Sequence, residues 1–215
     1  MRRVLYITAL TATLTALGTA LGAASLSASL TACGAPNANY PYEQEPDPRK
    51  QEYIIGASDR LSIRVFAHDE FNTDIQVRPD GTITIAMIGD MKALDLTPTQ
   101  LKDQIIKAVA SFVKDKDVMV TVAVTEVNSY KVTVSGNVVQ PGVFPSKEFL
   151  TVAEAVALAA GPNRFAKSKE AVVIRPQKGG GVKRIPINYE QIREGGEEGL
   201  RQNLVLIRGD TVFFP

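Results

Sequence analysis

The sequence has few of the residues on which most catalytic and metal sites depend. Its 215 residues include one Cys, one His and no Trp. A single Cys excludes an internal disulfide and any multi-cysteine metal site, and a single His argues against a histidine-based metal cluster or catalytic triad. The net charge of +1 also lacks the strongly basic character of nucleic-acid-binding proteins. We therefore expect no metal, no cofactor and no nucleic-acid partner.

Charge is missing from the N-terminal region as well. After Arg2 and Arg3, no charged residue appears before Glu43. The stretch 4–30 is rich in Leu, Ala and Thr, which is typical of a secretory signal peptide. Its length alone also permits a membrane-spanning helix.

The end of this stretch favours a signal peptide that is removed. It reads Leu30-Thr31-Ala32-Cys33-Gly34, with the only Cys of the chain behind two small residues. This run resembles the lipobox of bacterial lipoproteins, in which the signal is cut before a Cys that takes up lipid. We predict that residues 1–32 are the signal and that Cys33 is lipidated; the alternative is an incidental Cys inside an uncleaved anchor.

The segment that follows is rich in proline. We predict that residues 33–52 contain the lipidated Cys and a flexible tether, because four prolines alternate there with polar residues. Such a segment is expected to be extended and solvated, and unable to bury a core.

Periodicity predicts a first folded unit over residues 53–127. Apolar residues alternate in 61–65, 75–77 and 83–85, which indicates three strands, with a turn at Pro79-Asp80-Gly81 that makes a hairpin of the second and third. A capping box at Thr97 begins a helix that is expected to end near Lys114. The expected buried face comprises Leu101, Ile105, Ala108 and Phe112. A strand over 118–124 closes the unit.

A second unit is predicted over residues 128–215. A strand runs to Gly136, and Pro141-Gly142 turns the chain into a second strand. If Gly142 has a positive φ, a larger residue there would destabilise the protein by about 1 kcal/mol. A helix follows from the capping box at Thr151 to Gly161, then strands near 172–174 and 185–187, a helical turn over 189–193 and a last strand over 212–214. This order indicates a β-grasp fold, and the whole chain is predicted to be α+β with two units of similar size.

No group of residues has the arrangement of a catalytic site. The triple glycine 179–181 lacks the Lys-Ser or Lys-Thr of a phosphate-binding loop and precedes a strand, so it is interpreted as a hairpin loop. His68, Asp69 and Glu70 lie in a polar loop, where charged neighbours are usually solvated. Asp59 follows Gly56 closely and is expected to stabilise a turn through its side chain. We predict no catalytic residue.

Several motifs together resemble the polysaccharide biosynthesis/export family, which includes the Wza-like lipoproteins. Residues 53–65 are similar to the opening of its export domain, and residues 134–142 are similar to the soluble-ligand-binding β-grasp domain that follows it. The turn and motif positions that carry the resemblance are Gly56, Asp59, Asp80, Gly81, Gly89, Gly136, Pro141, Gly142, Gly161, Gly209 and Asp210. The chain departs from the family at Ala57-Ser58, where Pro-Gly is usual, at Ala86, where Pro is common, and at Asp95, where Gly is common.

The resemblance implies a fold, a location and partners. It implies a small export domain, a mixed sheet plus helix, over 53–127 and a β-grasp soluble-ligand-binding domain over 128–215. Members form homo-oligomeric rings, often octamers, which pass capsular polysaccharide or exopolysaccharide from an inner-membrane co-polymerase to the outside. The implied protein is a lipoprotein on the periplasmic face of the outer membrane, and not an enzyme.

The C-terminal end of the sequence suggests a further expectation about the pore. Wza-like members cross the outer membrane with a C-terminal amphipathic helix, whereas this sequence ends in the strand expected near 211–215. We expect a ring that does not itself make the pore, with a separate outer-membrane β-barrel as a further partner. Two alternatives are a periplasmic lipoprotein that binds saccharide or cell-wall glycan without transport, and a glycan-acting enzyme, which the lack of an acid–base pair disfavours.

Overall fold

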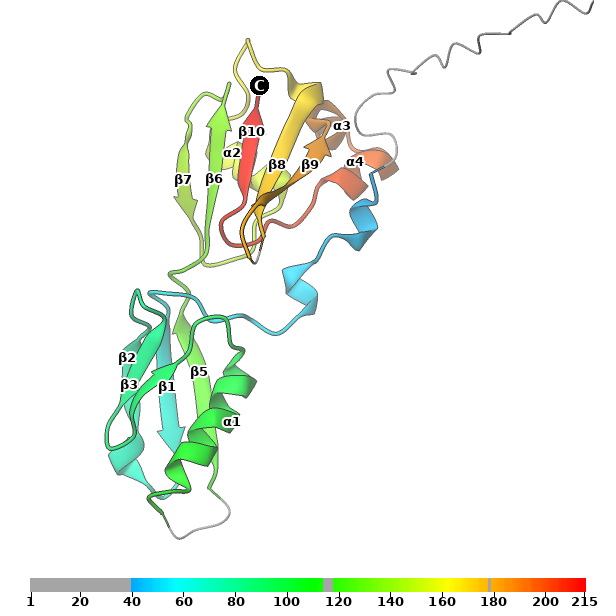
Figure 1. Ribbon diagram of the computed structural model, residues 1–215. Coiled ribbons are helices and arrows are strands. Elements are labelled where there is room, and N and C mark those ends of the chain that lie inside the picture. The colour runs from blue at the N-terminus through cyan, green and yellow to red at the C-terminus, as the bar shows by residue number, and fades with distance from the viewer. Residues whose placement is uncertain (1–39, 114–117, 178) are drawn as a thin grey trace, which may run out of the picture. The chain divides into compact units, whose positions relative to one another are not determined.

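The computed structural model describes residues 40–113, 118–177 and 179–215 (Figure 1). The predicted signal peptide and Cys33 lie outside the described residues. Within the described part, no helix combines the length and the apolar character that a membrane crossing requires.

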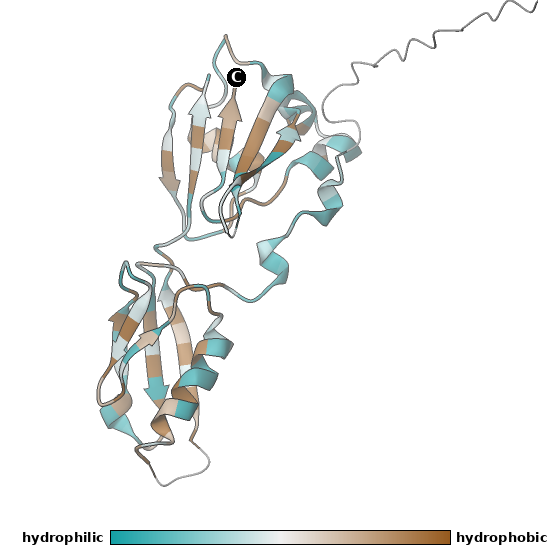
Figure 2. Ribbon diagram, in the orientation of Figure 1, coloured by the Kyte–Doolittle hydropathy of each residue, from teal (hydrophilic) through white to brown (hydrophobic). Residues whose placement is uncertain are grey.

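The first folded unit is built on a three-stranded antiparallel sheet. Its order is β2 (Thr73–Gln76), β1 (Arg60–Val65) and β5 (Val120–Glu126), with β1 in the centre. Leu61, Ile63 and Val65 are buried, whereas Arg60 before them and Arg64 between them are exposed. This alternation appears as bands of opposite hydropathy along β1 in Figure 2. The predicted strands are therefore confirmed, because period-two alternation places one face of the sheet on a core.

The predicted hairpin of the second and third strands is wrong in its pairing. The turn is present, since the Gly81 amide donates to the Arg78 carbonyl at 2.9 Å. However, β3 (Thr82–Ile85) forms its ladder with β4 (Gly89–Lys92) as a separate two-stranded sheet. The sequence around Asp90 is too polar to show strand periodicity, so β4 was not expected. The short 3-10 helix η3 (Asp69–Phe71) connects β1 and β2.

Helix α1 (Pro98–Val109) begins as predicted. The Gln100 amide donates to Thr97 Oγ1 at 3.2 Å, and the Thr97 amide donates to Gln100 Oε1 at 3.0 Å, which completes the capping box. The buried face comprises Leu101, Ile105 and Val109. The expected end near Lys114 and the burial of Phe112 are wrong, because the helix ends at Val109 and Phe112 beyond it is 53% exposed.

The second folded unit is a five-stranded mixed sheet with an α-helix against it. The strand order is β7 (Gly142–Pro145), β6 (Lys131–Gly136), β10 (Thr211–Phe214), β8 (Ala171–Pro176) and β9 (Val182–Ile187). The last strand, β10, inserts parallel to β6 and antiparallel to β8. Helix α2 (Val152–Leu158) contacts β6 and β10, and its buried Val152, Ala155 and Val156 complete the core. This arrangement confirms the predicted α+β class and the β-grasp unit.

Short helices complete the second unit. The 3-10 helix η4 (Ser168–Glu170) precedes β8, and α3 (Tyr189–Glu194) matches the predicted helical turn. Helix α4 (Gly196–Gln202) was not predicted. Its two glycines disfavour a helix by propensity, and a short helix depends on tertiary packing.

The positive φ considered for Gly142 is found at Gly136 instead. Gly142 is the first residue of β7, pairs with Val134 and has no positive φ. Its expected positive φ is therefore wrong, and an added Cβ would meet only Phe144 at 3.8 Å. Gly136 has a φ of +84°, and a Cβ there would lie 2.0 Å from the Phe214 carbonyl oxygen. The backbone of β10 thus excludes a side chain at Gly136.

The N-terminal segment differs most from expectation. Residues 40–51, here called the strap, contain the 3-10 helices η1 (Tyr42–Gln44) and η2 (Pro48–Lys50). Tyr42 belongs to the buried core of the second unit. The prediction of a solvated tether unable to bury a core is therefore wrong for the strap.

Candidate functional site

Buried charged residues mark the places where the structure depends on particular polar partners. Among the described residues, four polar or charged residues are buried: Asp59, Arg175, Gln202 and Asp210. A buried charge is costly unless charged or hydrogen-bonding groups surround it. The partners of the three charged residues define two sites. The first, here called the clamp, holds the strap through Arg175 and Asp210, and the second is a junction after β5 built around Asp59.

Tyr42 docks the strap on the β-grasp sheet. Its side chain is 3% exposed, and its hydroxyl donates to the Pro186 carbonyl on β9 at 2.7 Å. Burial first, and then the nearby charge of Glu198, raise the pKa of Tyr42 to about 12. The hydroxyl therefore stays protonated and remains a donor at neutral pH. Tyr42 also covers β9, an edge strand, with an aromatic side chain.

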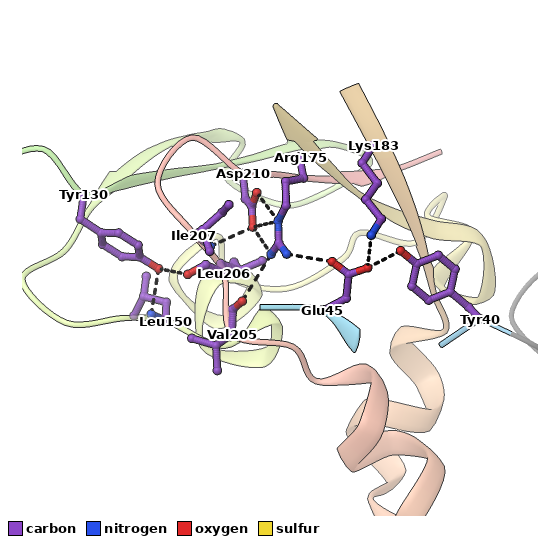
Figure 3. A network of polar contacts seen from close by, with 10 residues as sticks. All are labelled: Tyr40, Glu45, Tyr130, Leu150, Arg175, Lys183, Val205, Leu206, Ile207 and Asp210. Carbon is purple, nitrogen blue, oxygen red and sulfur yellow. Dashed lines mark hydrogen bonds and ion pairs between the residues drawn. The ribbon is translucent and has the colours of Figure 1, made fainter. Parts of the chain in front are cut away.

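Glu45 connects the strap to the sheet through charge (Figure 3). Its side chain is 2% exposed and lies between Arg175 at 3.0 Å and Lys183 at 2.6 Å. The Tyr40 hydroxyl donates to the same carboxylate. Burial raises the pKa of Glu45, but the hydrogen bonds from Lys183 and Tyr40 and the charge of Arg175 outweigh this effect and lower it overall. The carboxylate is thus held in its charged form.

Arg175 on β8 joins Glu45 to Asp210 (Figure 3). Its Nε and Nη2 donate to Asp210 at 3.0 and 2.7 Å, a bidentate pair, while Nη1 donates to Glu45. Asp210 also accepts the Ile207 amide at 2.9 Å, which closes the turn before β10. The two carboxylates balance the positive charges of Arg175 and Lys183, so the clamp as a whole is neutral. A guanidinium suits this place because its planar fork bonds two carboxylates at once.

Tyr130 supports the clamp from the beginning of β6. Its hydroxyl donates to the Leu206 carbonyl and accepts the Leu150 amide, both at 3.0 Å (Figure 3). The turn between Leu206 and Asp210 is therefore held by Tyr130 on one side and Arg175 on the other.

Asp59 forms the second buried site. Its carboxylate accepts the amides of Gly56 at 2.7 Å, Asn128 at 2.9 Å and Ser129 at 2.8 Å. The hydroxyls of Tyr53 and Ser129 donate to the same carboxylate at 2.6 and 3.0 Å. Burial first, and then the hydrogen bond to Asp59, raise the pKa of Tyr53, so this hydroxyl also remains a donor. Asp59 therefore holds both the turn before β1 and the chain as it leaves β5.

A cavity of about 440 Å³ opens beside the strap. The strap contributes Pro46 and Pro48 to its wall, and aromatic side chains come from Tyr53 and Phe149. Further lining residues include Ile54, Asp95, Ser129, Gln177, Ile207 and Arg208. Because the clamp holds the strap in place, it also shapes one wall of this cavity.

Two protein-family models match the regions that contain these features. The model of polysaccharide biosynthesis/export proteins matches residues 47–125, and the model of the SLBB domain matches residues 131–188. The two matches follow one another along the chain, with β1 and Asp59 in the first and Arg175 in the second. The chain belongs to the polysaccharide biosynthesis/export family. Its role is therefore in polysaccharide export, within a family of transport and binding proteins that act at the periplasm and the outer membrane.

Most of the motif positions of this export protein lie in turns rather than in one site. Asp80 and Gly81 form the β2–β3 turn, where Asp80 accepts the Thr82 amide at 3.0 Å and its hydroxyl at 2.6 Å. The others mark the ends of strands or helices, namely Gly89, Gly136, Pro141, Gly142, Gly161 and Gly209. Asp59 and Asp210 belong to buried networks, and Gly56 joins the first of these networks through its amide. Cys33 lies outside the described residues.

Sequence reasoning missed the strap half of the clamp. Tyr42 and Glu45 were assigned to a solvated tether, although Tyr40 and Tyr42 are unusual in a polar, proline-rich segment. Two aromatic residues there were the available signal, since they have large apolar surfaces to bury. Lys183 carried no signal, because its role depends on the place of β9 in the sheet.

Proposed function

We propose that this export protein is a periplasmic, ring-forming lipoprotein subunit of a capsule or exopolysaccharide export machine. The observation that carries the proposal is the presence of the export domain and the SLBB domain, in that order, in one chain. Polysaccharide is the proposed cargo, and an inner-membrane co-polymerase is the proposed partner that supplies it. The protein is proposed to position and pass the polymer rather than to catalyse a reaction on it.

The strap supports a specific attachment to the membrane. Tyr40 comes seven positions after Cys33 in the sequence, and a fully extended chain of that length reaches about 25 Å. Because Tyr42 and Glu45 dock on the β-grasp sheet, a lipid on Cys33 would keep this sheet within that distance of the bilayer. The strap would thus act as a short attachment to the second unit rather than as a long free tether.

A second candidate is a glycan-binding lipoprotein without a transport role. The cavity beside the strap favours this possibility, because its aromatic and polar lining is suited to a soluble ligand. Particle size separates the two candidates.

The size of the protein in membranes tests ring formation. We expect the native protein, extracted in mild detergent, to migrate at several times the 23.2 kDa of one chain, since a ring closes through repeated contacts between copies. Chemical cross-linking before extraction serves as the control against dissociation by detergent. A single-chain particle in both measurements would contradict the ring and favour the glycan-binding alternative.

The modification of Cys33 tests membrane attachment. We expect Cys33→Ser to abolish metabolic labelling with palmitate and to release the protein from membranes, because the acyl chains supply the apolar anchor. Asn37→Ser, a neighbouring substitution outside the lipobox, should label normally. Acyl labelling that persists in the Cys33→Ser protein would show that lipid, if present, is attached elsewhere.

A further inference from the structure

We infer that the cavity beside the strap binds one or two rings of a neutral saccharide. This inference rests on the proposed export function and names a place on the chain where a segment of the polymer, or a soluble fragment of it, would be held. A volume of about 440 Å³ lies within the range of roughly 300–1,000 Å³ that small-molecule sites occupy. The class of ligand is decided by the aromatic side chains of the wall, Tyr53 and Phe149, and by the polar side chains of the rim, chiefly Asp95 and Arg208.

The wall offers rigid apolar surfaces. Phe149 is half-buried, and its ring meets Tyr130 edge to face at 5.2 Å. The Tyr53 ring is held by the bonds of its hydroxyl to Asp59 at 2.6 Å and Ser129 at 3.1 Å. The apolar C–H face of a sugar ring packs well on such aromatic surfaces. Because both rings are fixed before a ligand arrives, binding would cost little side-chain entropy.

The rim offers paired hydrogen-bonding groups. Arg208 Nη2 and Asp95 Oδ1 lie 3.0 Å apart, and Gln177 lies on the same cavity. A guanidinium donates and a carboxylate accepts, so together they match the neighbouring hydroxyl groups of a sugar. Glu52 adds a further negative charge to the lining. This balance disfavours an anionic ligand and leaves a neutral saccharide as the best match.

The backbone at Asp95 supports a role for its side chain. Asp95 has a φ of +65°, a conformation that costs energy for a residue with a Cβ. Backbone outliers are enriched at functional sites. The carboxylate that this residue supplies is the one that pairs with Arg208 on the rim.

Saturation-transfer NMR with defined probes tests the inference on the full-length mature protein in nanodiscs. The probes are cellobiose and N,N′-diacetylchitobiose, which are neutral, and a hyaluronan disaccharide, which is anionic. We expect saturation of the neutral probes with a Kd on the order of 1 mM, which is typical of a small site with few hydrogen bonds. Failure of both neutral probes to bind at about 10 mM, or binding of the anionic probe alone, would overturn the inference.

Three variants locate the binding. Ile54 is 42% exposed and lines the cavity, so Ile54→Trp should fill it and weaken binding about tenfold without loss of core packing. Arg208→Ala should weaken binding to a similar extent by removing the donor from the rim. Val143→Trp on the exposed side of β7 adds the same bulk away from the cavity and should bind normally. Neutral-probe signals that both cavity variants leave unchanged would place the binding elsewhere and overturn the inference.

The same samples separate this inference from the proposed function. Particle size is measured on each variant, because the cavity variants should leave the ring intact. A normal ring that binds neither neutral probe would refute the saccharide site and leave the export ring standing. Saccharide binding by a single-chain particle would support the site and contradict the ring.

Discussion

Replacing Arg175 with Ala is expected to lower the free energy of unfolding by about 3–5 kcal/mol. The substitution removes one guanidinium from between two carboxylates, Asp210 and Glu45, whose side chains are 0% and 2% exposed. Both carboxylates would remain buried, and Glu45 would keep only Lys183 and Tyr40 as partners. Urea unfolding followed by circular dichroism measures the change.

Arg184 provides the matched control for Arg175. It lies opposite Ile174 on the neighbouring strand β9 and is exposed. Arg184→Ala should change stability by no more than about 0.5 kcal/mol, as for other exposed positions. Equal effects of the two substitutions would mean that the clamp contributes nothing beyond a surface charge.

The same substitution should release the strap. Limited proteolysis is expected to cleave near Tyr42 faster in Arg175→Ala than in the unchanged protein, because Glu45 loses its buried partner and keeps only Lys183 and Tyr40. A strap that resists cleavage equally in both proteins would show that Tyr42 and the remaining contacts of Glu45 are sufficient to dock it.

Asp59→Ala is expected to destabilise the protein by about 3 kcal/mol or more. Three amides and two hydroxyls donate to the Asp59 carboxylate, and the substitution leaves these donors without their acceptor. Asp59→Asn keeps one acceptor oxygen and should be intermediate. Thermal and urea unfolding measure the order of the three proteins.

An exposed aspartate supplies the comparison for Asp59. Asp103 lies on the exposed side of α1, and Asp103→Ala should leave stability nearly unchanged. If Asp59→Ala were as mild as Asp103→Ala, water would have to replace the carboxylate at no cost, and the junction after β5 would not depend on it.

These two buried sites explain how turns and loops without a regular sequence pattern are held in one conformation. Asp59 bonds to amides 69 and 70 positions away, and Arg175 joins the strap to the loop before the last strand. Each site fixes segments that lie outside the strands. In the proposed ring, such fixed segments would determine which surfaces are available to other copies and to the polymer.

Local signals in the sequence predicted the regular elements well. The capping boxes at Thr97 and Thr151 and the alternation in β1 are confirmed, because they depend on residues three or four positions apart or on neighbouring side chains. The order of elements was sufficient to indicate a β-grasp unit, in which β10 inserts parallel to β6. The motifs were sufficient to indicate the family.

Other features depended on contacts distant in sequence. The partner of β3, the position of Gly136 against Phe214 and the docking of the strap each require two segments whose approach no local pattern encodes. The sequence around Glu45 is polar, and it does not indicate whether the Glu45 side chain is solvated or buried. Only the folded sheet, which places Arg175 and Lys183 beside it, makes the buried position favourable. The sequence by itself thus determined most of the elements and the family, and the tertiary structure alone decided which charged residues become the clamp.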